Sequence, residues 1–264
     1  MNKRIKSIFS LAFLVVTLVI NTIGALGLIN GLDQKTVSDK YMTLITPAPL
    51  AFSIWSIIYP LLIITALVMI FKSEDEYYGK IIDSISPLFW ISSVFNILWI
   101  VAFSYEQIGL SVILILGALI SLALILQKLR AIPAERKYLI PVTFGLYGGW
   151  LFVAVVVNIA AFLVSLGWNG FGWPEAIWAI VIMAVAVILV IGVALKNRNV
   201  IFPLPVAWAY FGIFLQQSSI EDSSNALKAF AVIFGIVLVL ISAIILLMNK
   251  YKFIGYQVQE KETK

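Results

Sequence analysis

The chain has 264 residues, of which 62% are hydrophobic and 12% charged, and its formal net charge is +5. A soluble domain has about 25% charged residues, so this composition excludes a soluble globular protein and indicates a polytopic membrane protein. The chain has no cysteine and no histidine, which excludes disulfides, thiol nucleophiles and imidazole ligands for metals or haem. The charge is too diffuse for a nucleic-acid partner, and we expect neither a metal site nor a cofactor.

Eight apolar segments follow one another along the chain, each near the ~20 residues needed to cross a bilayer. The first resembles a signal peptide in its basic start, but it is long enough to span and no cleavage site stands out. The seventh is short and contains Pro203 and Pro205. We predict an all-α integral membrane protein with about eight transmembrane helices, at 8–30, 50–72, 86–104, 109–128, 139–166, 175–195, 199–217 and 227–248.

The charges test this topology. With the N-terminus inside, all but three of the 18 Lys and Arg residues fall on the inner side, the exceptions being Lys35, Lys40 and Lys228. The positive-inside rule therefore favours an even number of spans, with both termini in the cytoplasm. This distribution suits a bacterial cytoplasmic membrane.

No ionisable side chain is predicted in the middle of a span. Every Asp and Glu falls in a loop, in a tail or at a helix end, and so does every Lys and Arg. Proton pumps, ion-coupled carriers and voltage sensors place such residues in the membrane core, so the sequence argues against these classes. The same absence argues against acid–base catalysis.

Three of the predicted spans carry aromatic and amide side chains at helical spacing. The second opens with Pro47-Ala48-Pro49 and continues with a Trp-x-x-x-Tyr. The third contains Asn-x-x-Trp and the fifth Trp-x-x-x-Ala-x-x-x-Asn, and each set shares one helix face. The residues on these faces are Trp55, Tyr59, Asn96, Trp99, Trp150, Ala154 and Asn158.

These side chains allow two interpretations. The aromatic rings could form the walls of a pocket for a flat apolar ligand. Alternatively, the tryptophans form an interfacial belt and the asparagines bond neighbouring helices. With a rise of ~1.5 Å per residue, most of the set lies roughly 8–14 Å below the outer helix ends, which is deeper than a belt and favours the pocket.

The three patterns, taken in order, resemble the TspO/translocator-protein family, also called the tryptophan-rich sensory proteins, over about residues 8–166. The resemblance implies a TspO-like five-helix bundle at 1–168. Three additional transmembrane helices would then occupy 169–250, and 251–264 would be a polar cytoplasmic tail. The family pattern usually has a tryptophan just after the prolines, where this chain has Leu-Ala-Phe at 50–52.

The resemblance also implies a function. It indicates a membrane receptor, sensor or translocator that binds a porphyrin or other tetrapyrrole, or a sterol, in a pocket between the first, second, third and fifth helices. Carried over by motif, the seven residues named above would line this pocket, the loop at 31–48 would cover it, and the protein would form a homodimer.

Other classes of function remain open. A carrier for a small neutral or apolar solute is one alternative, and a structural or regulatory membrane subunit is another. Enzymatic action on a bound tetrapyrrole rests on family analogy alone.

Overall fold

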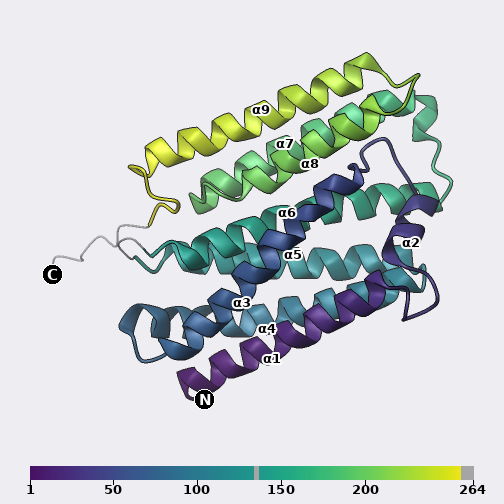
Figure 1. Cartoon of the computed structure of the whole chain (residues 1–264). Coiled ribbons are helices and arrows are strands. Elements are labelled where there is room, and N and C mark those ends of the chain that lie inside the picture. The colour runs from purple at the N-terminus through teal and green to yellow at the C-terminus, as the bar shows by residue number, and fades with distance from the viewer. Residues whose placement is uncertain (134–136, 257–264) are drawn as a thin grey trace.

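The computed structural model describes residues 1–133 and 137–256; Glu135, Arg136 and the end of the predicted tail, 257–264, lie outside the described residues. Apart from one isolated β-bridge, the regular elements of this part of the chain are helices, which run side by side as long rods (Figure 1). The short ones are α2 (Gln34–Lys40) and the 3₁₀ turns η1 (Pro49–Ile54) and η2 (Gly170–Gly172). The long ones are α1 (Lys3–Ala25), α3 (Trp55–Phe71), α4 (Glu76–Ser104), α5 (Ile108–Arg130), α6 (Leu139–Ser165), α7 (Glu175–Asn197), α8 (Pro203–Ser218) and α9 (Asn225–Met248).

The predicted all-α membrane fold is confirmed, and the number of spans needs one qualification. In the described part of the chain, 7 helices are long and apolar enough to cross a bilayer, η1 and α3 counting together as one. The remaining long helix, α8, has 16 residues and begins at Pro203. Proline is well placed in a first helical turn, where its missing N–H has no partner to lose, so the two prolines define a late start for α8.

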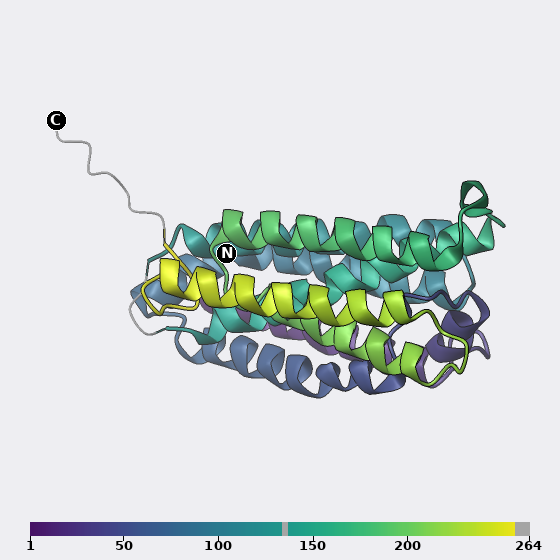
Figure 2. The ribbon, with the colours of Figure 1, turned by 90° about the horizontal axis from the view of Figure 1, so that it is seen from above.

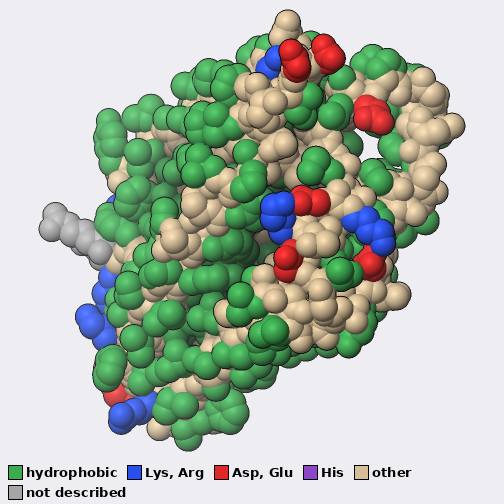
Figure 3. All heavy atoms as spheres, turned by 45° about the vertical axis from the view of Figure 1, so that its right-hand side comes forward, with side chains coloured by type: hydrophobic (Ala, Val, Ile, Leu, Met, Phe, Trp, Pro, Cys, Tyr) green, Lys and Arg blue, Asp and Glu red, His purple; other side chains and the backbone are tan. Residues whose placement is uncertain are grey.

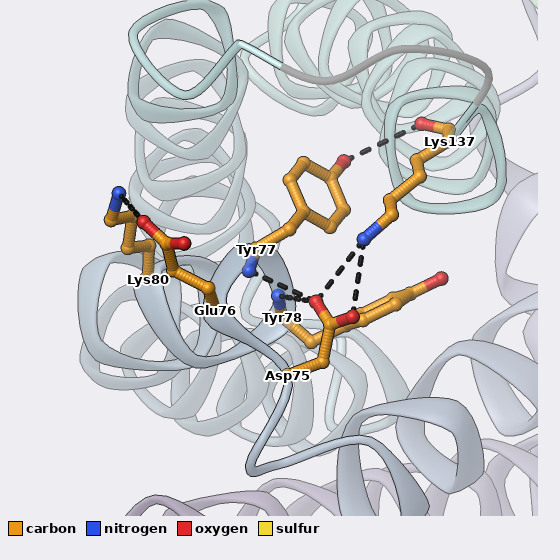
Figure 4. Close-up of polar contacts among 6 residues, drawn as sticks. All are labelled: Asp75, Glu76, Tyr77, Tyr78, Lys80 and Lys137. Atoms are coloured by element: carbon orange, nitrogen blue, oxygen red, sulfur yellow. Dashed lines mark hydrogen bonds and ion pairs between the residues drawn. The ribbon is translucent and has the colours of Figure 1, made fainter.

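The N-terminal end of α4 differs from its predicted start. The helix begins at Glu76 because Asp75 caps it, its carboxylate accepting from the N–H groups of Tyr77 and Tyr78 at 2.9 and 3.2 Å. The ammonium of Lys137 lies 3.1 Å from the same carboxylate and over both tyrosine rings (Figure 4). The N–H of Tyr78 and the charge of Lys137 lower the pKa of Asp75. A capped, charged first turn thus extends α4 beyond its apolar section.

The first five long helices and the last three form one bundle. In the first part, α4 packs on α1 and α5, α6 on α5, and α3 on α1 and α6. In the second part, α8 packs on α6, η1 and α9, and α9 also contacts α7 (Figures 1 and 2). Buried residues from both parts, such as Leu14 of α1 and Leu238 of α9, belong to one continuous hydrophobic cluster. The three additional helices therefore share the core of the first five.

The outer surface fits a bilayer. Figure 3 shows hydrophobic side chains over the lateral face, with charged side chains gathered toward the two ends of the rods. Both ends of the described chain lie at one end of the bundle (Figure 1). There Lys6 pairs with Asp83 at 2.6 Å, and Ile254 forms the β-bridge with Asn199, between α7 and α8. The start of the predicted polar tail is thus packed, and Ile254 is fully buried.

The contact between α6 and α8 makes a testable prediction at Gly149. A Cβ at this position would lie 2.2 Å from the carbonyl oxygen of Phe202. A backbone atom cannot swing away, and overpacking of this kind costs about 1–3 kcal/mol. We expect Gly149→Ala to lower the thermal unfolding temperature of the detergent-solubilised protein. The matched control is Gly148→Ala, whose Cβ would make ordinary van der Waals contacts with side chains, 3.4 Å from the Phe202 ring and 3.8 Å from Leu126. Equal stability of the two variants would contradict this packing.

Candidate ligand-binding site

A small void lies among α1, α3, α4 and α6, which are the first, second, third and fifth of the long helices. It has room for roughly one water molecule. Three of the seven predicted site residues, Trp55, Tyr59 and Asn96, border it. The complete lining is Leu14, Thr17, Leu18, Asn21, Trp55, Tyr59, Leu62, Phe89, Ser93, Asn96 and Tyr147.

Aromatic rings form one wall of this void. Trp55 and Tyr59 are four residues apart on α3, and their rings stack with centroids 4.6 Å apart. Tyr147 and Trp150 of α6 each present an edge-on contact to the Trp55 ring at 6.3 Å. Trp150 does not border the void, and its contact with this wall is the edge-on packing against Trp55. Such a wall offers flat, polarisable surface to an apolar ligand.

Polar groups without partners also face the void. Asn21 Nδ2 donates to Asn96 Oδ1 at 2.8 Å, which joins α1 to α4. The hydroxyls of Tyr59 and Tyr147 and the Nδ2 of Asn96 make no hydrogen bond with the described residues. Tyr147 is 4% exposed and Asn96 2%. Buried polar groups are normally paired, so this set is suited to a water molecule or to the polar edge of a ligand.

The remaining predicted residues form a separate hydrogen-bonded cluster. Asn158 Oδ1 accepts from Trp99 Nε1 at 3.3 Å and from Ser111 Oγ at 3.0 Å. Asn158 Nδ2 donates to the carbonyl of Ala154 at 2.9 Å. These bonds join α4, α5 and α6 outside the lining of the void. For Trp99, Ala154 and Asn158, the geometry matches the interhelical bonding that was the alternative interpretation.

Sequence reasoning missed eight of the eleven residues that border the void, and three of these, Asn21, Ser93 and Tyr147, lie beside features that the sequence shows. Each had a signal. Asn21 is an amide within the apolar run of the first span, and Ser93 lies three residues before Asn96. Tyr147 lies three residues before Trp150 and therefore shares its helix face.

The loop at 31–48 contains α2 and packs against one end of α4, α5 and α6. Val37 packs with Phe103, Ile108 and Ala161, which come from α4, α5 and α6. Glu106, just after α4, pairs with Lys40 and accepts from the Tyr41 hydroxyl at 2.9 Å. None of the loop residues is among those lining the void.

The sequence model of a family described as TSPO-like protein matches residues 7–245. The chain belongs to the TSPO-like family. The match extends past the motif-bearing helices to include α7, α8 and most of α9, so the additional helices fall within the family pattern. No curated protein and no solved structure matched the chain in the other two comparisons. Family membership and the apolar helices together establish an integral membrane protein.

The cluster at Asn158 predicts a stability difference between the two buried asparagines of this TSPO-like chain. Asn158→Ala removes three hydrogen bonds, whereas Asn96→Ala removes only the bond from Asn21. Interhelical hydrogen bonds in membranes are worth about 0.6–1.7 kcal/mol each. We expect Asn158→Ala to destabilise the protein more than Asn96→Ala in detergent unfolding measurements. A larger loss of stability in Asn96→Ala than in Asn158→Ala would contradict the assignment of the main structural role to Asn158.

The contacts of Glu106 with Lys40 and Tyr41 anchor the loop at 31–48 and depend on the charge of Glu106. The ion pair with Lys40 and the bond from Tyr41 lower the pKa of Glu106. The anchoring is therefore complete above the ordinary glutamate pKa of 4.5 and is lost as the pH falls through the lowered value. Glu106→Gln removes the charge at neutral pH, and we expect hydrogen exchange in residues 33–41 to become about two- to fivefold faster. Glu221→Gln, in the loop after α8, is the control and should leave exchange there unchanged.

Proposed function

We propose that the protein binds a flat hydrophobic ligand, of the porphyrin or sterol type, between α1, α3, α4 and α6. The observation that carries the proposal is the combination of the stacked Trp55–Tyr59 wall with the unpaired polar groups of Tyr59, Tyr147 and Asn96. The rings would contact the ligand face, and the polar groups would bond its polar edge. With no histidine in the chain, a porphyrin would be held without an imidazole–iron bond.

The size of the void sets a condition on binding. It has room for roughly one water molecule, far less than a porphyrin requires. Binding therefore requires the Trp55 and Tyr59 rings to turn or the helices around them to separate. Because α1 and α4 are joined at this depth by the bond from Asn21 to Asn96, ligand entry would also disturb that bond.

Fluorescence quenching tests the proposal directly. Protoporphyrin added to the purified protein in mild detergent should quench tryptophan emission to saturation, and Trp55→Phe should reduce the quenched fraction. Quenching that rises linearly without saturating would reject the pocket. Protoporphyrin flux in proteoliposomes then separates a translocator from a receptor, since a receptor gives saturable binding without flux.

A matched pair of tyrosine variants tests the polar edge of the site. Tyr147→Phe removes a hydroxyl that makes no bond with the described residues, so it should preserve stability while weakening protoporphyrin binding about five- to tenfold. Tyr210→Phe is the control, because its hydroxyl donates to the Met183 carbonyl at 2.7 Å, away from the void. It should lower stability and leave affinity unchanged. The same affinity loss in both variants would argue against a site at Tyr147.

A further inference from the structure

The segment that leads into α3 docks on α8. The Ala48 N–H donates to the carbonyl of Gly212 at 3.0 Å. Trp208, one turn earlier on α8, donates from Nε1 to the carbonyl of Ala51 at 2.9 Å. Because Trp208 and Gly212 are four residues apart, a single face of α8 makes both bonds. This face therefore holds the backbone at the start of η1.

The contact at Gly212 requires a glycine. A Cβ there would lie 2.7 Å from the Cβ of Ala51 and 3.1 Å from the Cβ of Pro47. Real Cβ contacts are longer, so any side chain at 212 would push the two backbones apart. Glycine lets them approach within hydrogen-bonding distance.

The same segment is also held where it begins, at Leu44 and Ile45. Gln217, 1% exposed, donates from Nε2 to the carbonyl of Leu44 at 2.8 Å and accepts at Oε1 from the Ser223 hydroxyl at 2.6 Å. Ile45, buried, lies in an apolar space bounded by α6, α7 and α8. Breaking a bond to a buried polar side chain leaves that group unpaired at a cost of about 1–3 kcal/mol. Residues 44–51 are thus fixed along their length.

The docked segment continues directly into the wall of the proposed pocket. Phe52 of η1 meets the ring of Trp150 edge-on at 5.7 Å, and Trp55 is the first residue of α3. A 3₁₀ segment has poorer hydrogen-bond geometry than an α-helix, so its position depends more on external contacts. The contacts of η1 with α8 therefore determine where Trp55 and Tyr59 lie.

We infer that α8 is a positioning element for the pocket, and that the three additional helices control ligand affinity through residues 44–51. The inference rests on the proposed function, since it concerns the same site. Trp208, Gly212 and Gln217 bond the backbone that leads to the pocket and do not line the void. Releasing that backbone would loosen η1, let the Trp55–Tyr59 wall shift, and weaken binding.

Hydrogen exchange measured without ligand tests the docking. Gly212→Ala should accelerate exchange in peptides covering residues 44–54 by about fivefold or more, because the added Cβ would push the carbonyl of residue 212 away from the Ala48 N–H. Trp208→Phe removes a different contact and should act in the same direction, which keeps the test informative if one variant folds poorly. Gly192→Ala on α7 is the matched control, since a Cβ there meets nothing within 4 Å. Unchanged exchange in both α8 variants would overturn the inference.

Protoporphyrin titration of the same variants tests the control of affinity. We expect binding about fivefold weaker or more in Gly212→Ala and unchanged in Gly192→Ala. Faster exchange combined with unchanged affinity would overturn control of the pocket by α8. Failure of the wild-type protein to bind protoporphyrin would instead overturn the proposed function, while the exchange measurement would still decide whether α8 holds residues 44–51.

Discussion

The structure depends on one constraint, which is that polar groups inside a bilayer must be paired within the protein. Several buried amides and hydroxyls meet it by bonding across helices, and others, such as Thr17 and Ser121, bond a carbonyl of their own helix. Asn158 joins three helices, Thr65 bonds Thr143 at 2.9 Å between α3 and α6, and Tyr210 reaches the carbonyl of Met183. Against this background the unpaired groups of Tyr59, Tyr147 and Asn96 stand out because they border a single void. Other buried polar atoms, such as Ser86 Oγ and Ser242 Oγ, also have no hydrogen-bond partner among the described residues, but they do not border this void.

The class of fold could be predicted from the sequence because lipid leaves so few options. Long uncharged runs must be helices, and the distribution of Lys and Arg indicated that both ends of the chain lie on the same side. The boundaries were harder. Hydropathy marks only the lipid-facing section of a helix, so it missed the charged first turn of α4, which Asp75 caps. It also missed α2, a seven-residue helix whose clearest signal is the cap at Asp33.

The candidate site was predictable in part, and the reason for the shortfall is geometric. Spacing along one helix identifies residues that share a face, but it does not say which neighbour that face meets. The aromatic pair of α3 and Asn96 border the void, whereas Trp99 bonds Asn158 of α6, and Asn158 in turn bonds Ser111 of α5. Only the three-dimensional arrangement separates the residues that border a pocket from those that bond neighbouring helices, which the sequence left open. The same limit explains why Tyr147, on the face of Trp150, was overlooked.

The need to pair buried polar groups also gives the additional helices, α7, α8 and α9, a role. Residues 44–51 have no helix of their own for most of their length, so their backbone groups need partners from elsewhere. α8 supplies them at Gly212, Trp208 and Gln217. A bundle of five helices would have to satisfy these groups in another way, either with water or with a different loop conformation. The position of the aromatic wall is therefore a property of the whole chain, because the segment that carries it is completed by helices far away in the sequence.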